Sequence, residues 1–280
     1  INDDVEQQSV RYGRPIQFVA SNSGMLTRSA TESTGATLQS NGFKVIADWG
    51  ETEYINASVT YSSGVFKESG KEYYMPNSGT LNFYGYYSAG SYTATHTAGS
   101  APTISVTDAF NHQDDLLVAA YKNVSYSATG TIPFAFTHAF AGIWFELDTS
   151  NSLSGTLGNI SITNMKNSGT YTLGTGWGSL GTTTAYTLAY SSANTAATSL
   201  LVIPQDFTSS NVVTVEFTPT GGSKVTLPVT NTLSTVSLAA GTRYKFTLKI
   251  EKVGVTITSV TMDSWPAGTT PAEFTKRENV

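Results

Sequence analysis

The stretch between residues 132 and 139 constrains the fold more than any other part of this chain. Large apolar side chains alternate there with small or polar ones, and in an extended strand alternate side chains point to the same face. One face would carry Ile132, Phe134, Phe136 and His138, and the other Pro133, Ala135, Thr137 and Ala139. A strand with one large apolar face is typical of a β-sandwich, in which that face fills the core.

Further strands are predicted at short apolar runs that are separated by turn residues, and no segment shows convincing helical periodicity. Residues 42–49 would place Phe43, Val45 and Ala47 on one face, and Lys44, Ile46 and Asp48 on the other. Residues 243–250 would point Tyr244, Phe246, Leu248 and Ile250 inward, and Arg243, Lys245, Thr247 and Lys249 outward. The sequence therefore predicts an all-β protein.

A change of domain is predicted in the middle of the chain. Residues 148–158 are rich in Ser, Asn and Gly, which is typical of a connection between domains. A chain of 280 residues is long enough for two domains that each bury a core. We therefore predict a β-sandwich over residues 1–150, with a leader and a first strand, and a second one over residues 151–280, with a short tail.

The residue types that usually carry catalysis are few and poorly spaced. The chain has no Cys, and its three histidines are His96, His112 and His138, without a His-Glu-x-x-His pattern. Neither a Gly-x-Ser-x-Gly elbow nor a phosphate-binding glycine loop with its lysine is present. His138 ends an apolar face, which favours a buried or edge histidine that is hydrogen-bonded to backbone. We predict that the protein is not an enzyme and needs no cofactor.

One group of oxygen-bearing side chains precedes the strand that is predicted to start at residue 116. Its members are Asp108, Asn111, Asp114 and Asp115. Such oxygens can bind calcium, but their spacing departs from that of an EF-hand loop. The pattern favours a turn over a metal site.

Charge and hydropathy exclude two classes of partner. The net charge is -5 and no basic stripe is present to neutralise phosphates, which excludes nucleic acid. No segment approaches the roughly 20 apolar residues of a membrane-spanning helix. The chain also begins without Met or a signal peptide, so we expect a mature or trimmed form.

Several segments, in the same order along the chain, resemble those of the fimbrillin family of Bacteroidota. They are residues 16–18, 26–30, 73–76, 81–87, 115–119, 136–140, 201–205, 241–248 and 257–265. The resemblance implies two transthyretin-like β-sandwich domains and a subunit of a cell-surface fimbria, a type V pilus. It also implies an exported lipoprotein precursor, and the acidic Asp3, Asp4 and Glu6 resemble the cluster that follows a lipidated cysteine. The membrane would then be reached only through the lipid anchor, at the outer membrane.

The family resemblance also implies how such subunits join. A surface protease specific for Arg cuts near the N-terminus, the first strand leaves, and a strand of the next subunit enters the groove. Here the removable strand would present Ile16, Phe18 and Ala20 to one side. Arg28 is the favoured cleavage site, because flexible polar residues surround it, whereas Arg14 precedes a proline. The alternative is that Arg28 is an ordinary loop residue and the first strand is permanent.

The donor strand is less clearly marked. Residues 266–280 offer few apolar side chains, and charged residues follow Phe274. The candidate donor residues are Val255, Ile257, Val260, Met262 and Phe274. A weak donor suggests a minor, tip or anchor subunit. Expected partners are other pilin subunits, the protease, and host or bacterial surface ligands.

A carbohydrate-binding module is the alternative from another class. Exposed aromatic side chains can stack on sugar rings, and the tryptophans are Trp49, Trp144, Trp177 and Trp265. Trp177 is flanked by glycines and is expected to be the most exposed of them. A flat aromatic platform would favour this function, whereas a groove covered by the first strand would favour the pilin.

Overall fold

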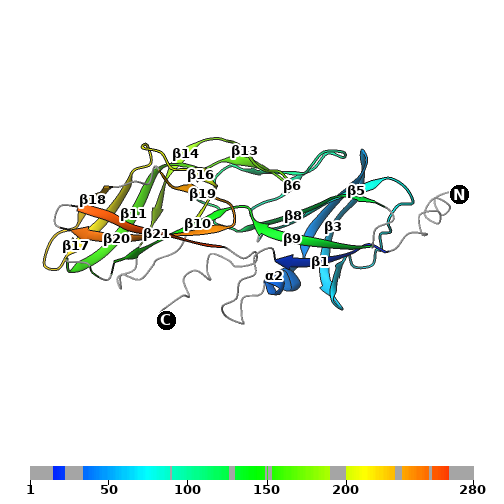
Figure 1. Cartoon of the computed structure of the whole chain (residues 1–280), viewed down its shortest axis with the longest axis horizontal. Helices are drawn as coiled ribbons and strands as arrows, with labels where there is room; N and C mark the ends of the chain where they lie inside the picture. The colour runs from blue at the N-terminus through cyan, green and yellow to red at the C-terminus, as the bar shows by residue number, and fades with distance from the viewer. Residues whose placement is uncertain are drawn as a thin grey trace.

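The computed structural model describes residues 15–22, 34–88, 90–125, 130–148, 150, 153–189, 200–230, 235–251 and 254–264. Nearly all elements within these residues are β-strands, which confirms the predicted all-β class. The molecule is elongated, with a closed barrel towards one end and a large sheet towards the other (Figure 1). Among the described residues, no helix combines the length and apolarity that a membrane span needs.

Seven strands form the barrel. Their order is β1 (Gln17–Asn22), β4 (Val65–Lys67), β3 (Thr52–Ser62), β2 (Phe43–Trp49), β5 (Thr80–Ser88), β8 (Leu116–Ser125) and β9 (Thr131–His138). Burial alternates along β9, and the buried residues are Ile132, Phe134, Phe136 and His138. The predicted alternation of this strand is confirmed. Phe43 packs against the rings of Phe134 and Phe136, with centroids 5.8 and 4.9 Å away.

One short helix, α2 (Thr34–Asn41), precedes β2, although no helical periodicity predicts it. Leu38 is buried, and no apolar residue of the helix lies three or four positions from it, so its sequence carries no repeating apolar face. Gly42 ends the helix with a φ of 70° and donates its N–H to the Leu38 carbonyl. A Cβ at Gly42 would lie 2.1 Å from the Val59 carbonyl oxygen, so only glycine fits this helix end.

Eight strands form the large sheet. Their order is β14 (Thr183–Leu188), β11 (Gly155–Lys166), β17 (Val213–Pro219), β18 (Val225–Thr230), β21 (Gly254–Ser264), β20 (Thr242–Glu251), β10 (Ala141–Leu147) and β15 (Leu200–Val202). The inward residues predicted for β20 are confirmed, because all four are buried. Arg243 is predicted to face outward, but it is not exposed to solvent. Arg243 is buried, and the strand register places it beside Gly142 of β10, which has no side chain to exclude it.

A four-stranded sheet lies over the barrel. It consists of β13 (Gly176–Leu180), β12 (Gly169–Thr172), β7 (Thr103–Val106) and β6 (Ala94–Thr95), and a two-stranded sheet pairs β16 (Gln205–Asp206) with β19 (Ser237–Leu238). Ile104 of β7 belongs to one buried cluster with Ile46 of β2 and Tyr84 of β5. The second face of β2 is therefore covered at Ile46 and Asp48, whereas Lys44 on the same face is exposed.

Strands from before residue 150 pair with strands from after it in two different sheets. β10 precedes that residue and runs parallel to β20, whereas β12 follows it and pairs with β7. Gln113 ties the two parts together, because its amide accepts the Leu201 N–H at 2.7 Å and donates to the Leu201 carbonyl at 3.1 Å. The division into domains at residue 150 stays a prediction.

Candidate functional site

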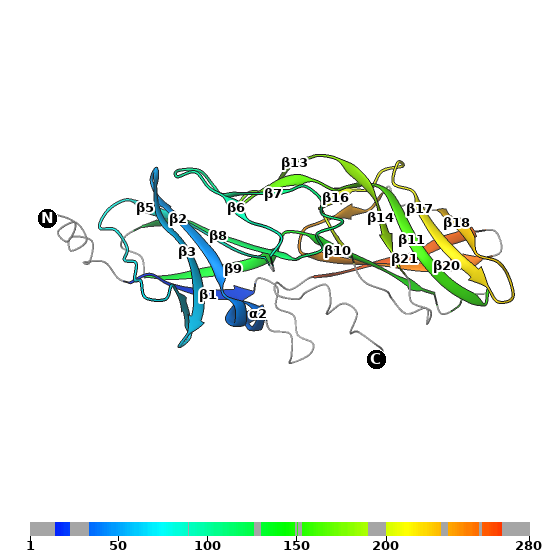
Figure 2. The same cartoon turned by 180° about the vertical axis from the view of Figure 1, so that it is seen from behind.

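The first strand is held unequally by its two neighbours. β1 runs parallel to β9 over six register pairs, from Gln17↔Thr131 to Asn22↔Phe136. On its other side β1 pairs with β4 only at Phe18↔Phe66. Just before the strand, the Ile16 N–H donates to the Tyr73 carbonyl at 2.7 Å. β1 lies beside β9, close to α2 (Figures 1 and 2), and one ladder supplies most of its backbone pairing.

Alternate side chains of this strand enter the barrel core. Ile16 and Phe18 are buried, and Ala20 packs against the same core. The Phe18 ring stacks on Phe134 at 5.6 Å and meets the edge of Phe83 at 5.9 Å. Full burial of a side chain such as Ile or Phe contributes about 1.5–3 kcal/mol. Side-chain burial therefore adds to the single ladder in holding β1.

This arrangement has the two features that β-strand addition needs. Without β1, the edge of β9 over residues 131–136 would present unpaired backbone groups, and the barrel would have gaps at the positions of Ile16 and Phe18. An incoming strand with apolar residues at alternate positions could fill both. An unfilled groove would tend to bind other chains, because the backbone groups of an open strand edge pair readily.

The structure places the remaining predicted site residues as follows. Arg28 and Phe274 lie outside the described residues. Val255 and Ile257 are buried in the core of the large sheet, Val260 packs partly against it, and Met262 is 66% exposed. These residues of β21 pair with β20 along the whole strand, from Thr242↔Ser264 to Glu251↔Gly254. They do not lie in one site with the first strand's core residues.

The expectation that Trp177 is the most exposed tryptophan is wrong. It is partly buried between Phe140 and Tyr171, and its indole N–H donates to the Ala139 carbonyl at 2.6 Å. Trp49 is 38% exposed, and its N–H donates to the Ser78 carbonyl. Flanking glycines did not predict exposure, because the small sheet that contains Trp177 packs against the barrel.

The predicted turn before residue 116 is confirmed. Asp108 accepts hydrogen bonds from the Asn111 backbone and from the side chains of Asn111 and Asn167. The bonds from the Asn111 side chain, the Asn167 side chain and the Asn111 backbone hold the Asp108 pKa below its ordinary value. Within the described residues, no group of three or more His, Cys, Asp or Glu is arranged to hold a metal ion.

The sequence did not predict a buried contact between Asp115 and His138. His138 Nδ1 lies 2.7 Å from Oδ2 and 2.9 Å from Oδ1 of Asp115, and both residues are buried. The burial of His138 is as predicted, but a carboxylate lies beside the ring where only backbone was expected. One signal was available, because an Asp that precedes one strand and a His that ends the next can meet when the strands pair antiparallel. The register Leu117↔His138 brings them together.

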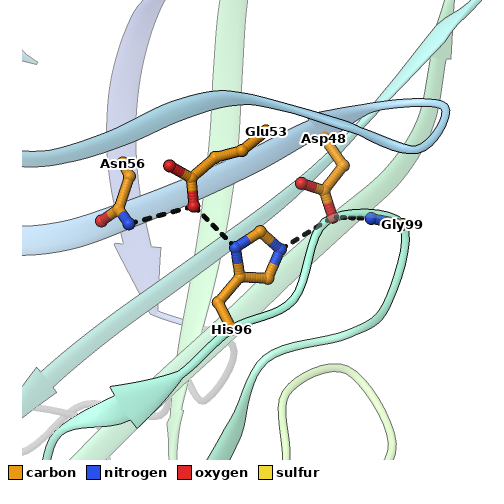
Figure 3. Close-up of polar contacts among 5 residues, drawn as sticks. All are labelled: Asp48, Glu53, Asn56, His96 and Gly99. Carbon is orange, nitrogen blue, oxygen red and sulfur yellow. Dashed lines mark hydrogen bonds and ion pairs between the residues drawn. The ribbon is translucent and has the colours of Figure 1, made fainter.

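A second histidine links the barrel to the small sheet (Figure 3). His96 Nε2 lies 2.9 Å from Asp48 Oδ2, and its Nδ1 lies 2.8 Å from Glu53 Oε2. A neutral imidazole has one N–H, so only the imidazolium can donate to both carboxylates. Asp48 is buried, and its Oδ1 has no hydrogen-bond partner among the described residues. The charge of this buried carboxylate is therefore balanced by His96.

This cluster should make stability depend on pH. Desolvation lowers the His96 pKa, but the hydrogen bonds and charges of Asp48 and Glu53 outweigh it and raise the pKa above 6.5. A raised folded-state pKa stabilises the protein fully below the unfolded-state pKa, and this contribution disappears as pH rises through the folded-state pKa. We expect His96→Gln to melt below the unchanged protein at about pH 5.5, and the gap to shrink towards about pH 9.

The matched control for this prediction is His112→Gln. The His112 ring faces the Asp108 carbonyl at 2.9 Å and bridges no pair of carboxylates. Thermal unfolding of all three proteins would be followed across the pH range. A His96→Gln gap that stays constant with pH would show that the imidazolium does not contribute.

Comparisons with known proteins agree with the fold. A family model described as fimbrillin-like matches residues 25–265. A candidate cell adhesion protein of Bacteroides uniformis has a TM-score of 0.60 and 19% identity, over 90% of this chain and 97% of that one. Another from Bacteroides ovatus has a TM-score of 0.59 and 17% identity, over 91% and 99%. At such identities the solved structures establish a shared fold, and no curated protein sequence matches.

Proposed function

Because the chain belongs to the fimbrillin-like family, we propose that it is a structural and adhesive subunit of a type V pilus on the cell surface, joined to its neighbours by β-strand donation. The observation that supports this most is the position of β1. One ladder to β9 and two buried side chains hold it, so a strand of similar pattern can replace it. The proposal includes no catalytic step and no cofactor.

The proposed trigger is cleavage after Arg28 by an Arg-specific surface protease. While the chain between β1 and β2 is intact, β1 stays close to its groove and rebinds at a high effective concentration. Cleavage removes this tether, so β1 can diffuse away and another strand can compete for the groove. The groove would then present the β9 edge together with the positions vacated by Ile16 and Phe18.

We propose a minor, tip or anchor position for this subunit. Donation of β21 would uncover Val255 and Ile257, which fill the core of their own sheet. The following residues 265–280 contain Phe274 but few other apolar side chains. The precursor would be exported as a lipoprotein, and its partners would be other pilin subunits, the protease and surface ligands.

Limited digestion with an Arg-specific protease tests this function. We expect mass spectrometry to show a fragment that ends at Arg28, and gel filtration to separate this fragment from the folded remainder. An unheated denaturing gel would then show multimers if the subunit also donates a strand, or none if it is a tip or anchor.

The control variant is Arg28→Ala, which should leave the fragment attached. Resistance of the unchanged protein at Arg28 would contradict the proposed trigger. A fragment that is cut but stays bound in the presence of excess donor strand would contradict strand replacement itself.

A further inference from the structure

A polar pocket of about 600 Å³ lies where β11, β13, β14 and β16 meet. Its lining includes Asn164, Lys166, Leu180, Thr183, Asp206 and Asn211. The remaining lining side chains are also polar, so Leu180 is the one apolar contributor. Ligand pockets have volumes of about 300–1,000 Å³ and are usually apolar. This pocket has the size of a ligand site, and its polar residues expose both polar and apolar atoms, which suits a polar ligand with apolar faces.

Hydrogen bonds fix one wall of the pocket before any ligand binds. The buried Asn211 amide donates to the carbonyls of Thr163 and Asn164, both at 3.1 Å, and accepts the Thr208 N–H at 2.8 Å. Asn164 has a φ of 56° at a bulge in β11, and its amide donates to the Ser210 carbonyl at 2.7 Å. The turn of residues 208–211 is thus fastened to β11, so ligand binding would cost little ordering.

Two opposite charges line the pocket without neutralising each other. In the described part of the chain, neither Lys166 nor Asp206 forms an ion pair, whereas Lys224, Lys245 and Lys249 each contact a glutamate. One Asp206 oxygen accepts the Ser237 hydroxyl at 2.5 Å, which leaves the other oxygen available to a ligand. A residue with a carboxylate acceptor and a residue with an ammonium donor therefore line the same space.

We propose that this pocket binds a saccharide residue. Sugar hydroxyls donate and accept hydrogen bonds, so they can serve the Asp206 carboxylate, the Lys166 ammonium and the Asn164 amide together. Hydrogen bonds to charged groups are stronger than those between neutral groups, so Asp206 and Lys166 should contribute most of the affinity. The pocket contains no barrel residue, so this inference is independent of β1 replacement.

Titration of the full chain with methyl glycosides, followed by NMR shifts of the protein, tests the proposal. The probes are methyl β-D-glucopyranoside, methyl N-acetyl-β-D-glucosaminide and methyl β-D-glucuronide. We expect at least one to bind. Lys166→Met should weaken that probe about tenfold or more, whereas Asp206→Asn should weaken a neutral glycoside to the same degree but not the negatively charged glucuronide. Binding of the glucuronide alone would assign the ligand as an acidic sugar held by Lys166. Binding of the neutral glycosides would assign Asp206 and the amides as the main contacts.

Two further variants make the test specific. Asn164→Gly suits the positive φ and keeps the Asn211 bonds to β11, so it should keep the fold. It removes the amide and its bond to the Ser210 carbonyl, so affinity should fall. Lys44→Met changes an exposed lysine of the barrel and should leave affinity unchanged. The proposal would be overturned if no probe shifted the NMR signals of the protein at concentrations up to about 50 mM. It would also be overturned if the pocket variants left binding unaltered. Release of the fragment ending at Arg28 would be unaffected in either case, so the two proposals fail separately.

Discussion

A disulfide that ties β1 to β9 should keep the groove closed after cleavage. The register pairs Gln17 with Thr131, and neighbouring strands lie about 4.7–4.9 Å apart, within the Cα separation that a disulfide accepts. Neither residue belongs to the buried core, and the chain has no Cys that could pair wrongly. We expect the oxidised Gln17→Cys/Thr131→Cys protein to be cut after Arg28 and to retain the fragment completely.

The open groove can be measured with a labelled peptide of residues 15–22, which copies β1. After digestion, the reduced variant should release its fragment and bind the peptide, whereas the oxidised variant should bind none. This readout does not depend on whether the subunit also donates a strand. The single variant Gln17→Cys controls for the substitution and should behave like the unchanged protein under both conditions. Equal peptide binding by the oxidised and reduced double variant would refute the replacement of β1.

Strands with a strict period of two were predictable from sequence, because one face of each fills a core. β9 and the inner face of β20 follow this rule, with Phe134 and Phe246 fully buried. The rule fails where a second layer covers the outer face. Ile46 and Asp48 on the second face of β2 are buried because the small sheet lies over them, and that sheet joins β7 to β12 from distant parts of the chain. Local alternation contains no information on such long-range pairing.

The candidate sites also differ in how far the sequence predicts them. The first strand could be found from a short apolar run near the N-terminus, whereas its unequal pairing depends on a parallel ladder to a strand more than a hundred residues away. The His96 cluster and the Lys166 and Asp206 pocket were invisible, because each joins polar residues from separate strands. Isolated polar residues in loops carry no pattern until the strands are paired.

Breaking the buried contact between Asp115 and His138 should be among the most destabilising changes in the chain. Asp115→Ala leaves His138 buried without its carboxylate, and loss of one partner of a buried pair costs about 3–5 kcal/mol. The pair also fixes the junction between β8 and the end of β9, where the two strands share only the pairs Leu117↔His138 and Val118↔Thr137. Denaturant unfolding at constant pH would measure the change in free energy of unfolding.

The double variant Asp115→Leu/His138→Leu separates the ion pair from the packing. An apolar replacement of similar volume avoids the desolvation of the buried polar groups, so the double variant should cost less than either single change. If the pair instead gives net stability through its charges, the double variant should be at least as unstable as Asp115→Ala. The first outcome would mean that the pair specifies how β8 meets β9 rather than adding stability. In that case the double variant should unfold less cooperatively, which the slope of its denaturation curve would report.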